Sequence, residues 1–141
     1  MQDKLKVAVL GTGQMGSGIV RLLIRKRGLE IVGVYARRAD RAGVDVGEAI
    51  GHGTKIGVEL TNDLPGMLSS VKPDVVIQAT FSRIEQAAVE IKTAVQGKAN
   101  VISIFQYAIS LLRYNSKKGL NYIQISVSCI ILRRNNDGTH A

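Results

Sequence analysis

The chain has 141 residues, of which 45% are hydrophobic, and a formal net charge of +8 at pH 7. This hydrophobic content supports a buried core and excludes a disordered protein, and no apolar run approaches the roughly 20 residues of a membrane-spanning helix. A basic protein can bind nucleic acid or a small anion, but the chain has no zinc-finger spacing and no RNA-recognition motif, so we expect neither a nucleic-acid nor a membrane partner.

Short apolar runs and helical patterns alternate from the N-terminus onward. Residues 5–10 predict a buried strand, and residues 15–27 predict a helix whose apolar side chains share one face. Gly28 is predicted to cap the end of that helix. Residues 30–36 predict a second strand, and the polar stretch after it carries one helical turn at residues 46–50.

The same alternation continues to residue 104. The elements expected there are a weak strand at residues 55–60, a helix at residues 62–70, a strand at residues 73–80, a helix from a capping box at Ser82 and Glu85 to Gly97, and a strand at residues 100–104. Strands that alternate with helices are typical of parallel crossovers. We therefore predict an α/β fold, with a Rossmann-type doubly wound, mostly parallel sheet and helices on both faces.

A glycine-rich turn, GTGQMG, joins the first strand to the first helix. Its spacing matches G-x-G-x-x-G, in which the glycines permit a tight turn, the approach of a pyrophosphate and close helix packing. The free amides and the positive dipole at a helix start favour phosphate. The pattern predicts a dinucleotide site, while a tight turn without a ligand remains the alternative. The predicted cofactor-binding residues are Gly11, Thr12, Gly13, Gln14, Met15 and Gly16.

The end of the second strand bears on the choice of cofactor. A NAD site has an acidic residue about 20 positions after the glycines, to hold the ribose hydroxyls. Arg37 and Arg38 stand there instead, and two guanidinium groups suit the 2′-phosphate of NADP. We predict NADP as the preferred cofactor, with NAD as the alternative, because Asp40 can hold the ribose if the loop curls back. Two solvated loop arginines are the simpler explanation of the same residues.

Other site residues are predicted from the ends of the fourth and fifth strands. Ligands of doubly wound sheets lie beyond the carboxyl ends of the strands. Ala79, Thr80 and Phe81 follow the fourth strand, and Ser103 lies near the end of the fifth. These residues are predicted to lie near the nicotinamide half of the cofactor, with ordinary loop packing as the alternative.

Beyond these patterns, residues 1–104 resemble the N-terminal domain of the dihydrodipicolinate reductase-like NAD(P)-dependent oxidoreductases. The segments that carry the resemblance are VAVLGTGQMGSGIV, EIVGVYARRADRAGVDVGEAIG, KPDVVIQAT and NVISI. The resemblance implies a cytoplasmic oxidoreductase that acts on an amino acid-derived small molecule. The similarity is greatest to members that oxidatively deaminate 2,4-diaminopentanoate, and the alternative reaction is a reduction of the dihydrodipicolinate reductase type. Family members have a second domain that supplies most substrate contacts and joins the subunits into a homo-oligomer.

Residues 105–141 depart from that family. They carry a single acidic residue, Asp137, and we expect either a truncated chain with a changed reading frame or a sixth helix–strand unit. The second alternative has a helix at residues 107–113 and one strand along residues 123–131, where apolar and polar residues alternate. In either case we expect the substrate domain of the family to be absent.

Catalytic and metal-binding residues are not identified by the sequence. His52 is expected to be a solvated loop histidine, His140 is assigned no role, and Cys129 is expected to behave as a small hydrophobic residue. A single cysteine excludes an internal disulfide and fits a reducing compartment. We predict no metal site and leave open whether the chain alone turns over a substrate. A nucleotide-sensing module that binds without catalysis is the alternative function.

Overall fold

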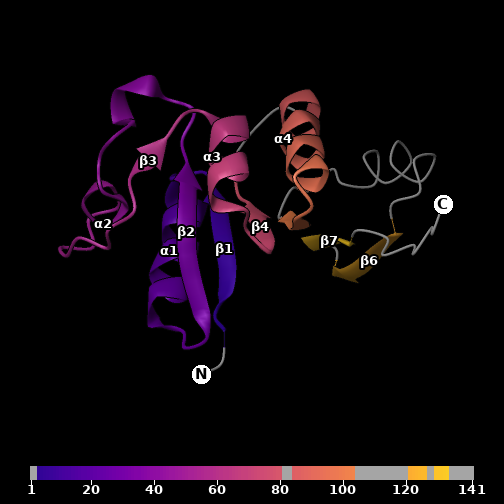
Figure 1. Cartoon of the computed structure of the whole chain (residues 1–141), viewed down its shortest axis with the longest axis horizontal. Helices are drawn as coiled ribbons and strands as arrows, with labels where there is room; N and C mark the ends of the chain where they lie inside the picture. Colours follow the sequence, from indigo (N-terminus) through magenta and orange to yellow (C-terminus); the bar gives the residue numbers. More distant parts are fainter. Residues whose placement is uncertain (1–2, 81–83, 104–120, 127–128, 134–141) are drawn as a thin grey trace.

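The computed structural model describes residues 3–80, 84–103, 121–126 and 129–133 (Figure 1). One seven-stranded sheet has the order β3-β2-β1-β4-β5-β7-β6. The strands are β1 (Leu5–Leu10), β2 (Leu29–Tyr35), β3 (Leu60–Thr61), β4 (Val75–Gln78), β5 (Asn100–Ser103), β6 (Asn121–Ser126) and β7 (Cys129–Arg133). Strands β1 to β5 are parallel, whereas β7 pairs antiparallel with both β5 and β6. The predicted mostly parallel α/β fold is confirmed.

Helices cover both faces of the parallel part of the sheet. Helix α1 (Gln14–Arg25) packs on the face to which Val7 and Val9 of β1 belong, whereas α3 (Leu64–Val71) and α4 (Ile84–Gln96) pack on the opposite face (Figure 1). Alternate residues of β1 thus enter different cores, which explains why residues 7–10 form a continuous apolar run. The two helical layers hold the central strands in place from both faces. The predicted dinucleotide site lies at the carboxyl ends of these strands.

Two short elements lie in the connection between β2 and β3, namely a 3-10 turn at Ala39–Arg41 and helix α2 (Val46–Ala49). The predicted strand at residues 55–60 is wrong except at its last residue, because β3 spans only Leu60–Thr61. Asp45 explains the difference. Its carboxylate accepts hydrogen bonds from the backbone amides of Ile56 (3.1 Å) and Gly57 (2.9 Å), so these amides are held in a loop.

Asp45 also caps α2, since its side chain accepts a 2.8 Å hydrogen bond from the amide of Gly47. Burial raises the pKa of Asp45, but the backbone hydrogen bonds outweigh burial and leave the pKa below its ordinary value of 3.8. A carboxyl whose pKa is depressed by folding stabilises the fold above its unfolded pKa, and that contribution is lost as the pH falls through the folded pKa. The loop therefore depends on an ionised Asp45.

We expect the Asp45→Asn variant to unfold more easily than the wild type at neutral pH. The difference between the two should begin to shrink below about pH 3.8 and disappear as the pH falls through the lower pKa of folded Asp45, where its carboxyl becomes neutral. Thermal unfolding followed by circular dichroism from pH 7 to pH 2.5 measures this. A difference that stays constant across that range would show that the charge of Asp45 has no part in holding the loop.

The C-terminal part of the sheet differs from the sequence-based expectation. A single strand along residues 123–131 is wrong, because β6 and β7 are separate strands that pair with each other, with Ile123 opposite Ile131. Alternating apolar and polar residues fit one long strand and a hairpin equally well, so periodicity does not locate the break. The predicted helix at residues 107–113 and the capping residue Ser82 lie outside the described residues.

Helix ends agree with the sequence to within a few residues. Helix α1 ends at Arg25, with Lys26 and not Gly28 as its cap, and Gly28 instead adopts a left-handed conformation with φ +81° at the following turn. Helix α3 begins at Leu64, two residues after the expected start, and its capping residue Asp63 accepts from the amide of Gly66 at 3.1 Å. Among the described residues, none of the helices has the length and hydropathy required to cross a bilayer.

Candidate nucleotide-binding site

The glycine turn connects β1 to α1, and two of its glycines are required by the chain itself. Gly11 has φ +108°, and a Cβ there would lie 2.8 Å from the carbonyl oxygen of Ala79. A Cβ on Gly16 would overlap the carbonyl of Gly11. Only glycine allows the first turn of α1 to pack this closely on the sheet.

Gly13 has no such structural requirement. Its φ is −70°, which any residue adopts, and a Cβ there would meet no protein atom within 4 Å. Gly13 is the N-cap of α1, which has no side-chain cap and no acidic residue in its first turn. The backbone amides that begin the helix therefore face an open space with positive potential, which fits a phosphate group.

A cavity of about 230 Å³ lies beside this turn. It is lined by Gly11, Thr12, Gly13, Ala36, Arg37, Arg38, Arg41, Ala79 and Thr80. These residues come from the carboxyl ends of β1, β2 and β4, where a doubly wound sheet is expected to bind its ligand. The structure thus brings together the glycine turn, both predicted arginines, and Ala79 and Thr80 after the fourth strand.

The other predicted site residues that the structure describes do not line this cavity. Gln14 and Met15 begin α1 next to the cavity, and both are exposed. Gly16 is buried under the turn. Ser103 is almost completely buried, and its hydroxyl donates a 2.7 Å hydrogen bond to Oε1 of Gln78. This hydrogen bond links the neighbouring strands β5 and β4. Phe81 lies outside the described residues.

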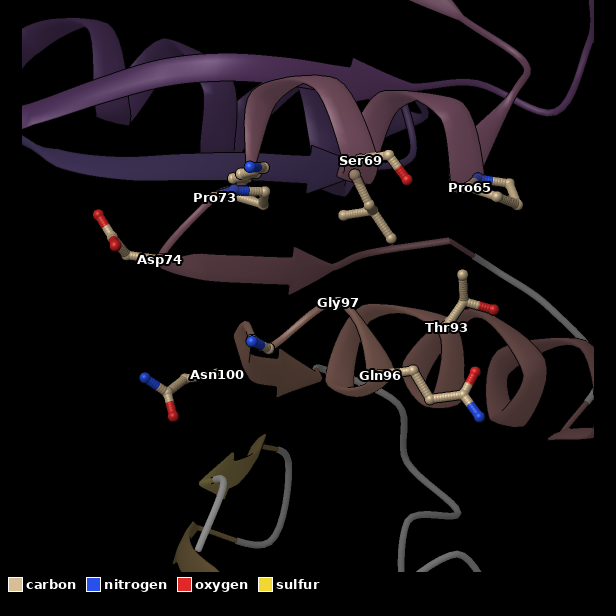
Figure 2. A pocket seen from close by; sticks show the side chains of 11 residues that line it. Pro65, Ser69, Pro73, Asp74, Thr93, Gln96, Gly97 and Asn100 are labelled. Atoms are coloured by element: carbon tan, nitrogen blue, oxygen red, sulfur yellow. The ribbon is translucent and has the colours of Figure 1, made fainter. Parts of the chain in front are cut away.

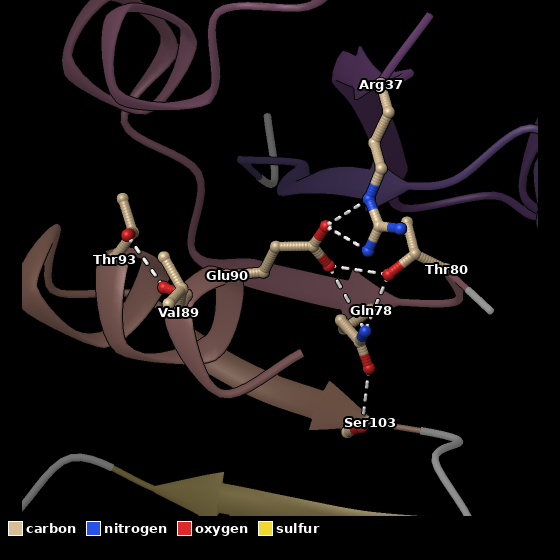
Figure 3. A network of polar contacts seen from close by, with 7 residues as sticks. All are labelled: Arg37, Gln78, Thr80, Val89, Glu90, Thr93 and Ser103. Carbon is tan, nitrogen blue, oxygen red and sulfur yellow. Dashed lines mark hydrogen bonds and ion pairs between the residues drawn. The ribbon is translucent and has the colours of Figure 1, made fainter. Parts of the chain in front are cut away.

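A buried carboxylate that sequence reasoning missed lies behind the cavity, and Figure 3 shows the polar network around it. Glu90, from the middle of α4, is only 5% exposed. Its Oε1 accepts from Nε (3.2 Å) and Nη2 (3.0 Å) of Arg37. Its Oε2 accepts from Thr80 Oγ1 (2.5 Å) and Gln78 Nε2 (3.2 Å). Glu90 therefore ties the ends of β2 and β4 to α4.

This charge pair also affects Tyr35 at the end of β2. Burial raises the pKa of the Tyr35 phenol, the Glu90 carboxylate raises it further, and the Arg37 guanidinium opposes the change. Tyr35 is thus held in its neutral form near the site. No change in charge is expected there at physiological pH.

The other two arginines of the cavity have different surroundings. Arg38 forms an ion pair with Asp40 at 2.8 Å in which both side chains are exposed, by 77% and 60%. Arg41 lies in the 3-10 turn and donates to Thr12 Oγ1 (2.9 Å) and to the carbonyl of Ala49 (2.8 Å). Sequence reasoning missed Arg41, although its place shortly after Arg37 and Arg38 in a short polar loop was the available signal.

A larger cavity, of about 680 Å³, lies between α3 and α4 (Figure 2). Its lining includes Pro65, Ser69, Asp74, Thr93 and Asn100. Asp74 precedes β4 and Asn100 begins β5, so one end of this cavity lies at the amino ends of these strands, and the cavity extends between the helices toward Pro65. None of the predicted site residues lines it, and within the described ranges no group of His, Cys, Asp and Glu has the arrangement of a metal site.

Comparison with known proteins agrees with this geometry. The family model described as "Dihydrodipicolinate reductase, N-terminus" matches residues 5–104, which include the whole parallel sheet and the glycine turn. The chain belongs to this family. Its nucleotide-binding domain is the Rossmann-type N-terminal domain of a dihydrodipicolinate reductase-like oxidoreductase.

Two curated relatives and one solved structure illustrate the similarity. The chain is 37% identical over 103 residues to 4-hydroxy-tetrahydrodipicolinate reductase of Methanothermobacter thermautotrophicus, covering 70% of the chain and 36% of that protein. It is 34% identical to 2,4-diaminopentanoate dehydrogenase of Acetoanaerobium sticklandii, covering 72% and 29%. The structure of amine dehydrogenase from Mycobacterium smegmatis superposes with a TM-score of 0.66 at 28% identity, covering 71% and 29%. The chain thus spans about a third of the length of these relatives.

Proposed function

We propose that the dihydrodipicolinate reductase-like domain binds a nicotinamide dinucleotide at the glycine turn, with NADP preferred over NAD. The observation that carries the proposal is Gly13, where neither the backbone conformation nor any neighbouring atom requires glycine. A cofactor diphosphate that approaches the first amides of α1 supplies the missing reason. Positive charge from the arginines beside the turn favours the cofactor with the additional phosphate.

The proposed roles follow the cavity. The backbone from Gly11 to Gly16 holds the pyrophosphate, and the arginine-lined end holds the adenosine ribose, where Arg37 and Arg38 were predicted to meet the 2′-phosphate. Ala79, Thr80 and the following Phe81 are proposed to lie near the nicotinamide. Ser103 donates a hydrogen bond to Gln78, and Gln78 donates one to Thr80. Ser103 is therefore proposed to position Thr80 through Gln78.

For the reaction, we propose hydride transfer between the nicotinamide and a carbon of an amino acid-derived small molecule, by oxidative deamination of 2,4-diaminopentanoate or by a reduction of the dihydrodipicolinate reductase type. Relatives named for the reduction of 4-hydroxy-tetrahydrodipicolinate and for the dehydrogenation of 2,4-diaminopentanoate support this class and do not separate its two members. The domain described here supplies cofactor binding and orientation. Contacts with the substrate, assembly into a homo-oligomer through a further domain and a location in the cytoplasm are parts of the same proposal.

We propose the following division of the chain, which was also expected from the sequence. Residues 1–104 form the nucleotide-binding domain, and residues 105–141 form a separate C-terminal segment. The described part of that segment extends the sheet, since β7 pairs with β5 through Ile102 and Ile131. This pairing supports a segment that adds a strand to the edge of the nucleotide-binding domain.

The experiment that tests the proposal is a titration of the purified chain with NADPH and with NADH, followed by nicotinamide fluorescence at fixed salt. We expect saturable binding of both, with a dissociation constant in the micromolar range for NADPH and a weaker one for NADH. Turnover of either proposed substrate by the chain would favour an enzyme over a nucleotide sensor. A folded chain that binds neither nucleotide would contradict the proposed function.

A further inference from the structure

The three arginines around the cavity differ in how far their charges are already compensated. Arg37 makes a two-point contact with Oε1 of Glu90, a carboxylate with 7% side-chain exposure. The other oxygen of Glu90 is held by Thr80 and Gln78. Moving Arg37 toward a ligand would leave a buried carboxylate without its cation, which is costly in free energy. Arg37 is therefore committed to the fold.

Arg38 already has an anionic partner. Its ion pair with Asp40 is exposed on both sides, so it is weak and screened by salt. The carboxylate of Asp40 also places a negative charge 2.8 Å from the Arg38 guanidinium, and this charge repels a phosphate. Arg38 and Asp40 together therefore contribute little net positive potential to the cavity.

Arg41 differs from both. Its two hydrogen bonds run to neutral oxygens, Oγ1 of Thr12 and the carbonyl of Ala49, and in the described part of the chain it forms no ion pair. These bonds orient the guanidinium on the glycine turn while leaving its charge uncompensated. Arg41 also lines the cavity together with Gly11 and Gly13.

We propose that Arg41 is the specificity-determining residue for the 2′-phosphate that distinguishes NADP from NAD, and that Arg37 is withheld from this role by Glu90. The inference rests on the proposed function, since it assigns a group within the same site. An oriented guanidinium loses little conformational freedom on binding and forms charge-assisted hydrogen bonds with phosphate. The 3-10 turn at Ala39–Arg41 is the element that brings Arg41 back over Thr12.

The test compares Arg41→Gln with Arg38→Gln, a matched change in the same loop, in the complete 141-residue chain. NADPH and NADH are titrated by fluorescence, and adenosine 2′,5′-bisphosphate and 5′-AMP are then used as competitors. Arg41→Gln should weaken NADPH by about 10- to 100-fold while leaving NADH nearly unchanged. Arg38→Gln should change the ratio of the two dissociation constants by less than about threefold. The bisphosphate should lose affinity in parallel with NADPH, because it carries the same 2′-phosphate.

The outcomes separate this inference from the function on which it rests. A wild-type chain that binds neither nucleotide overturns both. A wild type that binds both, with an Arg41→Gln variant that weakens them equally, overturns the inference alone, because Arg41 would then act through the shape of the turn. An Arg38→Gln variant that loses more of the preference for NADPH over NADH than Arg41→Gln does would also overturn the inference alone. Arg41→Lys, which keeps the charge without the planar fork, should retain a preference between those of the wild type and Arg41→Gln.

Discussion

The Glu90→Ala variant is expected to lose about 3 kcal/mol of unfolding free energy, the largest stability effect of any side-chain truncation at this site. Removing one partner of a buried ion pair leaves the other charge without compensation. Here the loss also removes the Glu90 acceptor of Thr80 Oγ1 and one of the two acceptors of Gln78 Nε2, which keeps its hydrogen bond to Thr80. We place the value at the lower end of the range for buried pairs because the Arg37 side chain is 35% exposed and is partly solvated.

Urea denaturation followed by circular dichroism measures this loss, with two comparison variants. Glu90→Gln keeps the shape of the side chain and one acceptor oxygen, so we expect a smaller loss of about 1.5 kcal/mol. Glu85→Ala removes a carboxylate from the exposed first turn of the same helix and should cost less than about 1 kcal/mol. Equal losses for Glu90→Ala and Glu85→Ala would show that the network does not stabilise the domain.

The Gly13→Val variant is expected to lose at least about 100-fold in NADPH affinity while remaining folded. The φ of −70° accommodates valine, and the added atoms meet no protein neighbour within 4 Å of the Cβ. The side chain instead fills the space through which a diphosphate would reach the amides at the start of α1. Several charge-assisted hydrogen bonds would be lost together, which explains the size of the effect.

Gly18 provides a matched control within the same helix. A Cβ there also meets nothing within 4 Å, and its φ is ordinary, but Gly18 lies inside α1 on its exposed side. We expect Gly18→Val to bind NADPH like the wild type. Fluorescence titration of both variants, after circular dichroism has shown that they are folded, makes the comparison. Undiminished binding by Gly13→Val would mean that the open space at the turn is not where the cofactor lies.

The parallel core could be predicted from the sequence because its signals are local. The apolar runs of β1 and β4 and the glycine turn each determine structure within a few residues. The failures involve contacts that sequence periodicity does not register. Asp45 holds amides more than ten positions away in a loop, and this removes the strand expected at residues 55–60. The alternating pattern of residues 123–131 runs from β6 into β7, so it does not mark where one strand ends and the next begins.

The sequence predicted the backbone turn of the site, but it did not predict which charged side chains pair with one another. The glycine spacing indicated a phosphate-binding turn, and the structure surrounds it with the residues expected from β2 and β4. The sequence could not show that Arg37 meets Glu90, because the partners are 53 positions apart. A signal did exist: Glu90 falls on the same helical face as the buried Ala87 and Ala94, where an acidic residue requires a partner.

The most direct test of the central claim is amide chemical-shift mapping of the 15.2 kDa chain during titration with NADPH. The account predicts that the largest shift changes occur at the backbone amides of residues 11–16, with further changes at Arg38 and Arg41. Changes concentrated at the cavity between α3 and α4, around Ser69 and Thr93, would contradict it, because the nucleotide would then bind between these helices and not at the glycine turn. Shifts absent throughout a folded chain would contradict it equally.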